Sequence, residues 1–255
     1  MQKTVAIIPA RYASTRFPGK PLALLGGKPV IQWVWENVSA MPELACAVVA
    51  TDDERIAEAV KGFGGRAVMT ASTHRSGTDR CGEVVRKLRE EGQAFDVAIN
   101  VQGDEPFVRQ EQLRSLVDCF ADGEVKIATL KTAIHSTAEL MSPNNVKVVC
   151  DLRGRALYFS RQPLPHVRGV EPEQWMEHHP YFKHVGIYAF RTETLEALVR
   201  LQQSPLELCE SLEQLRWLEN GYEIQVKETA VANIGIDTPA DMALAEQYLT
   251  KERNN

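Results

Sequence analysis

Hydrophobic residues in the first hundred positions follow two alternating patterns. In one pattern apolar residues recur at helical spacing, as in residues 30–38 and 81–88. In the other, short apolar runs typical of buried strands lie at residues 4–8, 45–50, 67–69 and 96–101. This alternation of strands and helices predicts an α/β fold with a doubly wound, mostly parallel sheet. In such sheets, ligands bind beyond the carboxyl ends of the strands.

Local signals predict where several of these elements begin and end. Pro9 cannot donate to a sheet ladder, so we expect the first strand to stop there. Residues 51–54 have the Thr-x-x-Glu pattern of a capping box, which predicts the start of the second helix. Residues 74–80 are polar and are expected to form a loop before the helix at 81–88.

The middle of the chain changes character, because strand-like segments follow one another with little helix between them. These segments lie at residues 126–133, 145–150, 155–160 and 183–191. They predict a smaller mixed-sheet lobe. Residues 162–181 are irregular, and we interpret His178 and His179 as part of a solvated loop because no further metal ligand lies at a suitable spacing. A capping box at residues 204–207 predicts a helix over 208–219.

The composition narrows the class of function. Of 255 residues, 44% are hydrophobic and 25% are charged, as in an ordinary globular protein. The formal charge of −5 argues against a nucleic-acid-binding protein, which would carry a basic stripe. No apolar run approaches the ~18–20 residues that span a bilayer, and no signal-peptide pattern is visible. The five cysteines lie far apart without a C-x-x-C pair, which is typical of reduced thiols in a cytoplasmic protein.

The segment after the first strand carries the strongest chemical signal. Residues 9–21 contain Arg11, Arg16 and Lys20 and have little to bury. A cationic loop that leaves a central strand is well placed to hold a phosphate chain. A solvated surface loop is the alternative, but this loop exceeds the ~2–6 residues typical of compact α/β connections. Because Pro21 follows Lys20 and no G-x-G-x-x-G lies nearby, neither a P-loop nor a dinucleotide-binding fingerprint is supported.

Two aspartates have open interpretations at the level of single residues. Asp104 follows the predicted strand at 96–101, and Gly103 lets the backbone turn before it. A carboxylate near a phosphate implies Mg²⁺ between them, because two bare anions repel each other. Spacing alone supports equally well a turn before the next helix. Asp237 lies just before the cap of the last helix at Thr238, where it could simply support the helix N-terminus.

The cationic loop together with residues 100–106 closely resembles the 3-deoxy-manno-octulosonate (Kdo) cytidylyltransferases, also called CMP-Kdo synthetases. Further stretches similar to this family follow in the family's order, at residues 76–80, 156–161, 184–188, 213–216 and 235–239. The likeness runs from about residue 5 to about residue 248, and residues 162–181 add nothing to it. Phe17 and Asp79 stand where Leu and Glu are more usual in the family.

The resemblance implies an enzyme that transfers CMP from CTP to the C2 hydroxyl of Kdo, releases pyrophosphate and uses Mg²⁺. It implies a single nucleotide-diphospho-sugar transferase-like domain, in which about 1–125 and 222–255 bind the nucleotide. Residues 126–221 would bind the sugar and form a dimer. The product would serve lipopolysaccharide biosynthesis in the cytoplasm, and the expected protein partner is a second copy of the chain, with no nucleic acid or membrane partner.

The resemblance also assigns site residues, position by position. Those implied for the triphosphate are Ala10, Arg11, Ser14, Arg16 and Lys20, and those for cytosine are Ser76, Gly77 and Arg80. Those implied for the sugar acid are Gln102, Arg161, His184, Tyr188, Glu213 and Gln214, with Arg161 facing its carboxylate because guanidinium groups bind carboxylates bidentately. Asp104 and Asp237 would hold the metal. The candidate catalytic residues are Arg11, Lys20 and Asp104.

Two other functions compete with this assignment. A cytidylyltransferase for another acidic sugar, such as a CMP-sialate synthetase, resembles the same loop but spaces its lysine differently. A non-catalytic nucleotide sensor could use the same fold, because fold does not imply function. The presence of both Asp104 and Asp237 argues against a sensor, since a sensor needs no metal-activated nucleophile.

Overall fold

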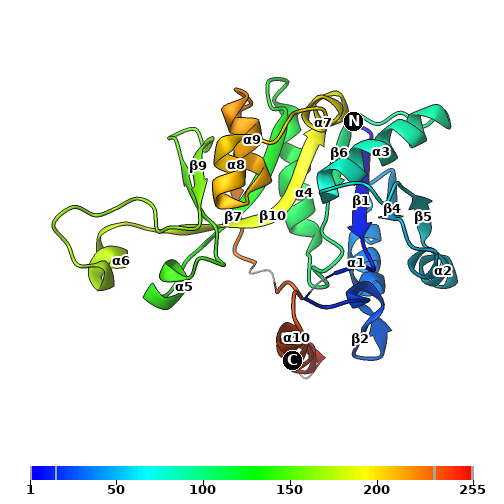
Figure 1. Cartoon of the computed structure of the whole chain (residues 1–255), viewed down its shortest axis with the longest axis horizontal. Coiled ribbons are helices and arrows are strands. Elements are labelled where there is room, and N and C mark those ends of the chain that lie inside the picture. The colour runs from blue at the N-terminus through cyan, green and yellow to red at the C-terminus, as the bar shows by residue number, and fades with distance from the viewer. Residues whose placement is uncertain (1, 15, 232–233, 254–255) are drawn as a thin grey trace. The chain divides into compact units, whose positions relative to one another are not determined.

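The computed structural model describes residues 2–14, 16–231 and 234–253 (Figure 1). The chain divides into two compact units. The first comprises Met1–Arg114, Phe190–Val199 and Asn233–Asn255, and the second comprises Ser115–Ala189 and Arg200–Ala232. Each unit is described separately below.

A parallel sheet forms the centre of the first unit. Its strands are, in spatial order, β6 (Val97–Asn100), β1 (Thr4–Ala10), β4 (Cys46–Thr51) and β5 (Arg66–Met69). All three pairings between neighbours are parallel, and every residue of β1 is buried. The predicted α/β class with a mostly parallel sheet is confirmed.

Helices in this unit bury their apolar faces against the sheet and each other. They are α1 (Val30–Ser39), α2 (Glu54–Gly62), α3 (Gly77–Glu90), α7 (Thr192–Leu198) and α10 (Pro239–Arg253), together with α4 (Gln110–Asp118), which continues into the second unit. The smaller elements are the 3₁₀ turn η1 (Lys20–Leu22) and the strands β2 (Leu24–Leu25) and β3 (Lys28–Pro29). Leu25, Phe107 and Ile236 share one apolar cluster with Ala245 of α10, so the C-terminal helix is packed beside the loop after β1.

The strands of the second unit pair in mixed directions, as the strand-rich middle of the chain predicts. Its strands are β7 (Ile127–Ala133), β8 (Lys147–Cys150), β9 (Ala156–Ser160), most of β10 (Phe182–Arg191) and β11 (Gln225–Glu228). β11 runs parallel to β7, whereas β8 runs antiparallel to β9 and β10. β11 therefore belongs to this unit, although the sequence analysis grouped residues 222–255 with the first part.

The helices of the second unit are short. They are η2 (Cys119–Ala121), α5 (Thr137–Met141), η3 (Pro172–Gln174), α6 (Trp175–His178), α8 (Pro205–Glu210) and α9 (Glu213–Glu219). The single helix predicted over residues 208–219 is wrong, because Ser211 adopts a left-handed conformation with φ of 53° and separates α8 from α9. His178 and His179 are exposed.

Pro9 does not end the first strand, which runs on to Ala10. The carbonyl oxygen of Ile7 accepts a hydrogen bond from the Val101 N–H, so the main-chain polar groups of Ile7 point toward β6. Those of Pro9, two residues further on, point the same way, because the direction alternates from one residue of a strand to the next. The pairing with β6 ends at Asn100 opposite Ile7, so no bond is required from Pro9. The missing N–H of the proline is therefore tolerated in a buried strand.

Two helix starts also differ from the predictions. The cap of α2 is Asp53, which accepts from the Arg55 N–H, because Thr51 is still part of β4. Residues 77–80 form the first turn of α3 and not a loop, since Ser76 and Asp79 make a reciprocal capping box. Each helix therefore begins within a few residues of its predicted start.

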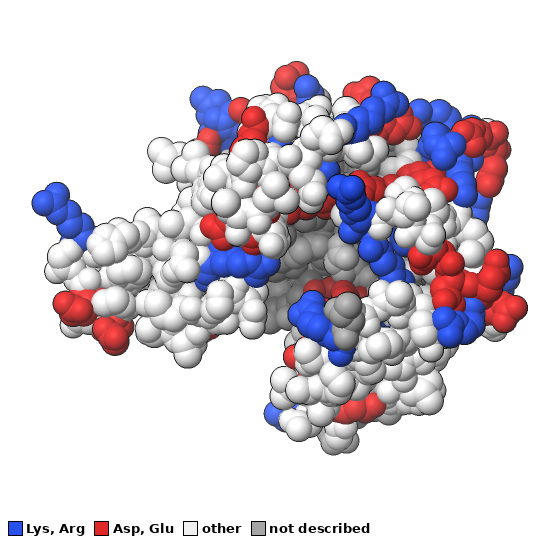
Figure 2. Space-filling view, in the orientation of Figure 1, with Lys and Arg blue, Asp and Glu red and all other residues white. Residues whose placement is uncertain are grey.

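The surface carries mixed charge. Figure 2 shows Lys and Arg side chains interspersed with Asp and Glu over this face of the molecule, with no continuous basic stripe on it. Among the residues that the structure describes, no helix is long and apolar enough to cross a membrane.

Candidate functional site

The carboxyl ends of β1 and β6 come close together at one edge of the parallel sheet. A Cβ atom placed on Gly103, after β6, would lie 2.7 Å from the carbonyl oxygen of Pro9. A Cβ on Gly77, at the start of α3, would lie 3.1 Å from the Pro9 ring. Any larger residue at position 103 would displace this backbone, so glycine is what allows the segment before Asp104 to approach the segment before Arg11.

Lys20 sits in a buried position at the start of η1, directly after the left-handed Gly19. Its Nζ lies 2.6 Å from Oδ2 of Asp104 and 3.2 Å from Oδ1 of Asp237. Arg16, which is exposed, places Nη2 3.2 Å from the other oxygen of Asp237. The structure thus brings together four charged residues, of which the first and the last lie more than two hundred positions apart in the sequence.

Backbone contacts hold the two aspartates in place. The Ile236 N–H donates to the carbonyl oxygen of Asp104 at 2.9 Å, which ties the segment after β6 to the segment before α10. Asp237 donates its own N–H to the Asp241 carboxylate at 3.1 Å, and the same carboxylate accepts from the Thr238 N–H at 2.8 Å. The Thr238 hydroxyl in turn accepts from the Asp241 N–H at 3.3 Å, so Thr238 and Asp241 cap the helix together, and the Asp237 carboxylate is left for Lys20 and Arg16.

The donor set at Lys20 suits a hard divalent cation together with a phosphate. Two carboxylates converge on one ammonium group, and Mg²⁺ in proteins typically takes one or two carboxylates plus substrate phosphate oxygens. In the described ranges no three His, Cys, Asp or Glu side chains are grouped in a way that could hold a metal by themselves. The two aspartates fit a metal that is completed by its substrate.

Two further cations of the first unit have buried donor atoms without a hydrogen-bond partner among the described residues. These atoms include Nη2 of Arg11 and Nε of Arg80. Arg80 is fully buried, donates to the Thr70 hydroxyl and pairs with Asp52 at 3.3 Å. Burial, and the nearby charge of Arg11, lower the pKa of Arg80, while Asp52 opposes this. Buried donors without partners are costly, so this pair points to an acceptor supplied by a ligand.

The other residues predicted for the nucleotide lie close to these cations in the chain. Ala10 is buried as the last residue of β1, and the Ser14 hydroxyl accepts from the Phe17 N–H at 3.4 Å. Ser76 caps α3, with its Oγ accepting from the Asp79 N–H at 3.1 Å. Gln102, predicted for the sugar, also lies here, because its Oε1 would be 3.7 Å from a Cβ on Gly77.

In the second unit, aromatic rings surround His184. Its ring lies 5.2 Å from Phe159 and 5.1 Å from Tyr188 between centroids, and Nε2 is 2.9 Å from the Thr129 hydroxyl. Burial lowers the pKa of His184 to about 3, so the imidazole is neutral at physiological pH. Burial, with a smaller contribution from the Glu213 charge, raises the pKa of Tyr188 well above its ordinary value. Both rings can therefore serve only as neutral hydrogen-bonding groups.

Arg161 is held by main-chain carbonyls. Its Nε donates to Glu210 at 2.7 Å, Nη1 to Pro143 at 3.1 Å and Nη2 to Ser211 at 3.4 Å. Lys147, buried nearby, donates to three carbonyls, including that of Arg161 at 2.5 Å. A guanidinium has five N–H donors, so three such bonds leave two. The three acceptors of the guanidinium are neutral carbonyls, whereas the Glu210 carboxylate accepts from the Arg161 main-chain N–H at 2.9 Å.

The two remaining residues predicted for the sugar lie at the start of α9. Glu213 opens the helix and is partly exposed, while Gln214 is buried. The second unit thus contains Arg161, His184, Tyr188, Glu213 and Gln214, and the first contains every residue predicted for the nucleotide and metal, with Gln102.

Comparisons with known proteins point to one family. A family model described as "Cytidylyltransferase" matches residues 5–227. A 3-deoxy-manno-octulosonate cytidylyltransferase of Bacteroides thetaiotaomicron is 54% identical over 250 residues, which are 97% of this chain and 98% of the relative. One from Parabacteroides distasonis is 51% identical over 253 residues, or 98% of this chain and 99% of the relative.

A solved structure agrees over the whole chain. The structure of CMP:2-keto-3-deoxy-manno-octonic acid synthetase complexed with CTP has a TM-score of 0.90 at 44% identity and covers 98% of this chain and 99% of its own. This chain belongs to the Kdo cytidylyltransferase family. A 4-diphosphocytidyl-2C-methyl-D-erythritol synthase from Anaerococcus prevotii, with a TM-score of 0.61 at 18% identity, shares the fold alone.

One departure from the usual Kdo cytidylyltransferase pattern has a structural account. Asp79 replaces the more usual Glu three residues after Ser76, and its shorter side chain still closes the capping box. Its Oδ2 accepts from the N–H groups of Ser76 at 3.1 Å and Arg75 at 3.2 Å. The departure therefore leaves the start of α3 intact.

Sequence reasoning missed several residues that support the predicted site of this Kdo cytidylyltransferase. Asp52 directly follows β4, and the sequence pattern already placed it at the carboxyl edge of the sheet where ligands bind, but its pairing with Arg80 was not predicted. Glu210 and Lys147 carry no such signal, because they meet Arg161 only through contacts across 49 and 14 positions of the chain. Glu83 was also missed.

The Glu83 carboxylate, on α3, ties down the loop that leads to Ser76. It accepts from the Ala71 N–H at 2.9 Å and from the His74 ring, and it pairs with Lys87 at 2.9 Å. Burial raises the pKa of Glu83, but the contacts with Lys87, Ala71 and His74 outweigh burial and lower that pKa to about 2. The ionised carboxylate is therefore strongly preferred in the folded protein.

Glu83→Gln is expected to reduce both stability and its dependence on acid. A carboxyl whose pKa is about 2 in the folded protein, against 4.5 for an unperturbed glutamate, adds stability above pH 4.5 that is lost as pH falls toward 2. Between pH 7 and pH 3 the native protein should therefore lose about 2 kcal/mol more than the variant. Urea unfolding of both proteins at the two pH values measures this difference, and equal losses would contradict the assignment.

Proposed function

We propose that this chain transfers CMP from CTP to the C2 hydroxyl of Kdo, producing CMP-Kdo and pyrophosphate. The observation that carries the proposal is the cluster in which Lys20 contacts both Asp104 and Asp237. This cluster lies in a chain that is 51–54% identical to curated Kdo cytidylyltransferases over nearly its full length. Unsatisfied buried donors on Arg11 and Arg80 supply independent support, because they require an acceptor that a bound nucleotide provides.

The chemical step is an in-line displacement at the α-phosphorus of CTP. The bond from the Kdo C2 oxygen to this phosphorus forms, the bond to the bridging oxygen of pyrophosphate breaks, and the hydroxyl loses its proton. Negative charge on the phosphate oxygens must be stabilised, so catalysis depends on positioning and electrostatics. Arg11, Arg16 and Lys20 are the cations available for this purpose.

Asp104 and Asp237 would hold Mg²⁺. When bound, the ion supplies positive charge beside the triphosphate and lowers the pKa of a coordinated hydroxyl, so no separate general base is required. The role of the protein is to aim two carboxylates at one point, which the contacts of Lys20 with both already achieve.

Cytosine would be selected at the start of α3. Its Watson–Crick edge presents an amino donor beside two acceptors, so its recognition needs both kinds of partner. Ser76 and Gly77 contribute backbone groups, and Arg80 contributes its unsatisfied Nε–H. The bonds of Arg80 to Thr70 and Asp52 would hold the guanidinium in place while it donates.

The residues of the second unit predicted for the sugar acid would supply its charge and hydrogen-bond partners. Arg161 retains two guanidinium donors for the carboxylate of Kdo. Neutral His184 and Tyr188, with Glu213 and Gln214, would bind the hydroxyl groups. We also propose a homodimer that supplies lipopolysaccharide biosynthesis, on the strength of the family alone; analytical ultracentrifugation tests the dimer.

The direct test is pyrophosphate release by the purified protein. Release should require CTP, Kdo and Mg²⁺ together, and omission of any one should abolish it. A panel that includes sialic acid separates the Kdo enzyme from a synthetase for another acidic sugar. Binding of CTP without turnover on any sugar acid would instead identify a nucleotide sensor and reject the proposal.

Arg161→Ala is expected to raise KM for Kdo roughly ten- to hundredfold and to leave KM for CTP almost unchanged. The lost interaction is a charge-assisted hydrogen-bonded pair, worth ~1.5–3 kcal/mol. Steady-state kinetics with each substrate varied in turn provides the measurement. Arg153→Ala, which removes an exposed arginine of the same unit, is the control. An equal increase in both KM values would contradict the role given to Arg161.

A further inference from the structure

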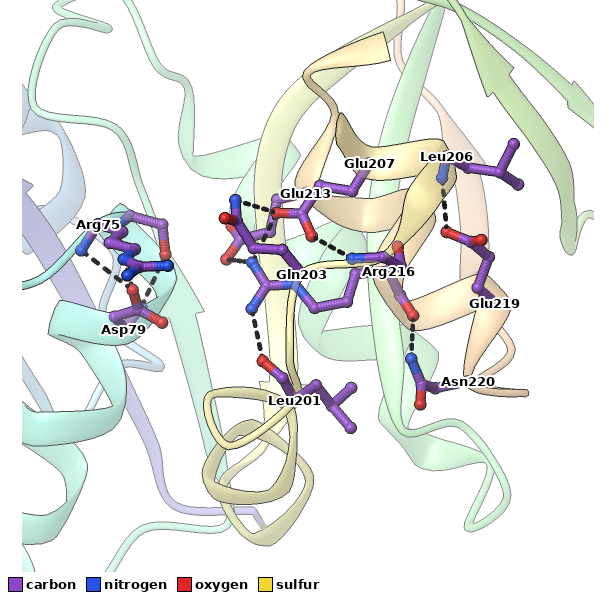
Figure 3. A network of polar contacts seen from close by, with 12 residues as sticks. Arg75, Asp79, Leu201, Gln203, Leu206, Glu207, Glu213, Arg216, Glu219 and Asn220 are labelled. Carbon is purple, nitrogen blue, oxygen red and sulfur yellow. Dashed lines mark hydrogen bonds and ion pairs between the residues drawn. The ribbon is translucent and has the colours of Figure 1, made fainter. Parts of the chain in front are cut away.

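Arg216 on α9 is a buried arginine placed between two carboxylates (Figure 3). Its Nη2 lies 2.8 Å from Oε1 of Glu207 and 3.3 Å from Oε1 of Glu213. Its Nη1 donates to the carbonyl oxygen of Leu201 at 3.1 Å. Three separate segments thus fix the guanidinium: the stretch before α8, α8 itself and the first turn of α9.

The two carboxylates differ in what else they do. Glu207 is buried and closes the capping box of α8, where Oε2 accepts from the Ser204 N–H at 3.2 Å. Glu213 is partly exposed, with 24% of its side chain accessible, and its charge acts on Tyr188. One carboxylate is therefore an internal anchor for Arg216, and the other is presented to solvent beside a residue predicted for the sugar.

The contact of Arg216 with Glu213 is not needed to hold α8 against α9. The Leu206 N–H of α8 donates to the Glu219 carboxylate of α9 at 3.1 Å (Figure 3). The Asn220 side chain also caps the end of α9 by donating to the carbonyl oxygen of Arg216 at 2.8 Å. The helices are thus joined at a second point, and the shorter contact of Arg216 Nη2 with Glu207 holds the guanidinium where the same nitrogen also reaches the partly exposed Glu213 carboxylate.

We propose that Arg216 is a positioning residue that holds the Glu213 carboxylate in one orientation for the hydroxyl groups of the sugar-acid substrate. A glutamate side chain has several rotamers, and fixing one of them before binding removes part of the cost of ordering it. Arginine suits this task because its planar fork has a defined direction, whereas lysine offers a point charge on a flexible stem. The inference rests on the proposed function and adds a residue that does not touch substrate.

The test compares Arg216→Lys and Arg216→Met with the native enzyme. We expect KM for Kdo to rise about tenfold in the Met variant and by less in the Lys variant, which can still pair with one carboxylate. KM for CTP should stay within about twofold. Arg155→Lys is the matched control, because Arg155 also joins two carboxylates in the same unit, those of Asp151 at 2.8 Å and Glu223 at 2.6 Å.

A double-mutant cycle separates positioning from a purely structural role. If Arg216 acts through Glu213, then Arg216→Lys should change KM for Kdo by less than about twofold when Glu213 is already Gln. If the effects of Arg216→Lys and Glu213→Gln on KM for Kdo multiply in the double variant, the two residues act independently and the inference is overturned. An unchanged KM for Kdo in Arg216→Lys, or equal increases in KM for Kdo and CTP, would also overturn it. If Arg216→Met does not fold, Arg216→Lys and its double-mutant cycle with Glu213→Gln still test the inference.

The proposed function can fail separately from this inference. A native protein that releases no pyrophosphate from CTP and Kdo rejects the proposed function. A native protein that turns over normally, beside an Arg216→Lys variant with unchanged kinetics, rejects only the role of Arg216.

Discussion

Asp104→Asn is expected to reduce kcat by roughly 10²–10³-fold. A metal ion at a reacting phosphate contributes several kcal/mol of charge stabilisation, and an amide oxygen binds Mg²⁺ far less strongly than a carboxylate. The same substitution weakens the 2.6 Å contact with Lys20, which would then pair mainly with Asp237. The reaction therefore loses a metal ligand, and the remaining charges are rearranged.

The fold should survive this change. Asp104 is tied to Ile236 through its main-chain carbonyl, which Asn retains, and the two side chains are nearly equal in size. Initial rates measured over a range of Mg²⁺ concentrations, beside an unchanged Tm, provide the check. Glu36→Gln is the control, because Glu36 is another partly exposed carboxylate of the first unit paired with a lysine. Full activity in Asp104→Asn would show that the metal assignment is wrong.

Lys20→Met is expected to lower kcat by a similar factor, about 10²–10³-fold. Removal of one preorganised donor from the site where charge develops typically has this effect. The loss should fall mainly on kcat, because charge on the phosphate oxygens changes most in the transition state. Lys20 is buried, so methionine can occupy nearly the same space.

Stability should change much less than rate in Lys20→Met. The side chains of Asp104 and Asp237 are 30% and 51% exposed, and water can replace their lost partner. We expect a loss below about 2 kcal/mol, measured by urea unfolding. Lys28→Met is the matched control, since Lys28 pairs with Glu36 at 2.7 Å on the same unit and lies over Trp33. Similar kinetic losses in both variants would contradict a specific role for Lys20.

Much of the fold could be predicted from residue patterns. Buried strands are recognisable as apolar, often β-branched runs because both faces of a parallel sheet are covered, and this identified the positions of β1, β4 and β6. The strand at β5 was also located, but the expectation that it is buried is wrong, because β5 lies at the edge of the sheet and its residues are partly exposed. Element ends were less predictable. Pro9 is accepted within β1 because the pairing with β6 ends before it, which the sequence pattern does not show. The break between α8 and α9 depends on the left-handed conformation of Ser211, for which the sequence has no local signal.

The candidate site, too, could be predicted only in part from the sequence. Arg11 and Asp104 each follow a buried strand, and ligands bind at the carboxyl edge of a parallel sheet, so both residues could be predicted to lie near the ligand. The convergence of Asp104 and Asp237 on Lys20 spans 84 and 217 positions and depends on the packing of α10. The assignment of individual residues to CTP, Kdo and metal stays a prediction for the experiments above.

By itself, the sequence determined the family, the α/β class and the residue types available for phosphate, metal and sugar, because these are properties of motifs and periodic patterns along the chain. Only the tertiary structure decided which charges meet. It set Lys20 between two aspartates, Arg161 against main-chain carbonyls and Arg216 between Glu207 and Glu213. Such contacts depend on side chains brought together from distant positions, and burial determines their strength, so no linear pattern encodes them.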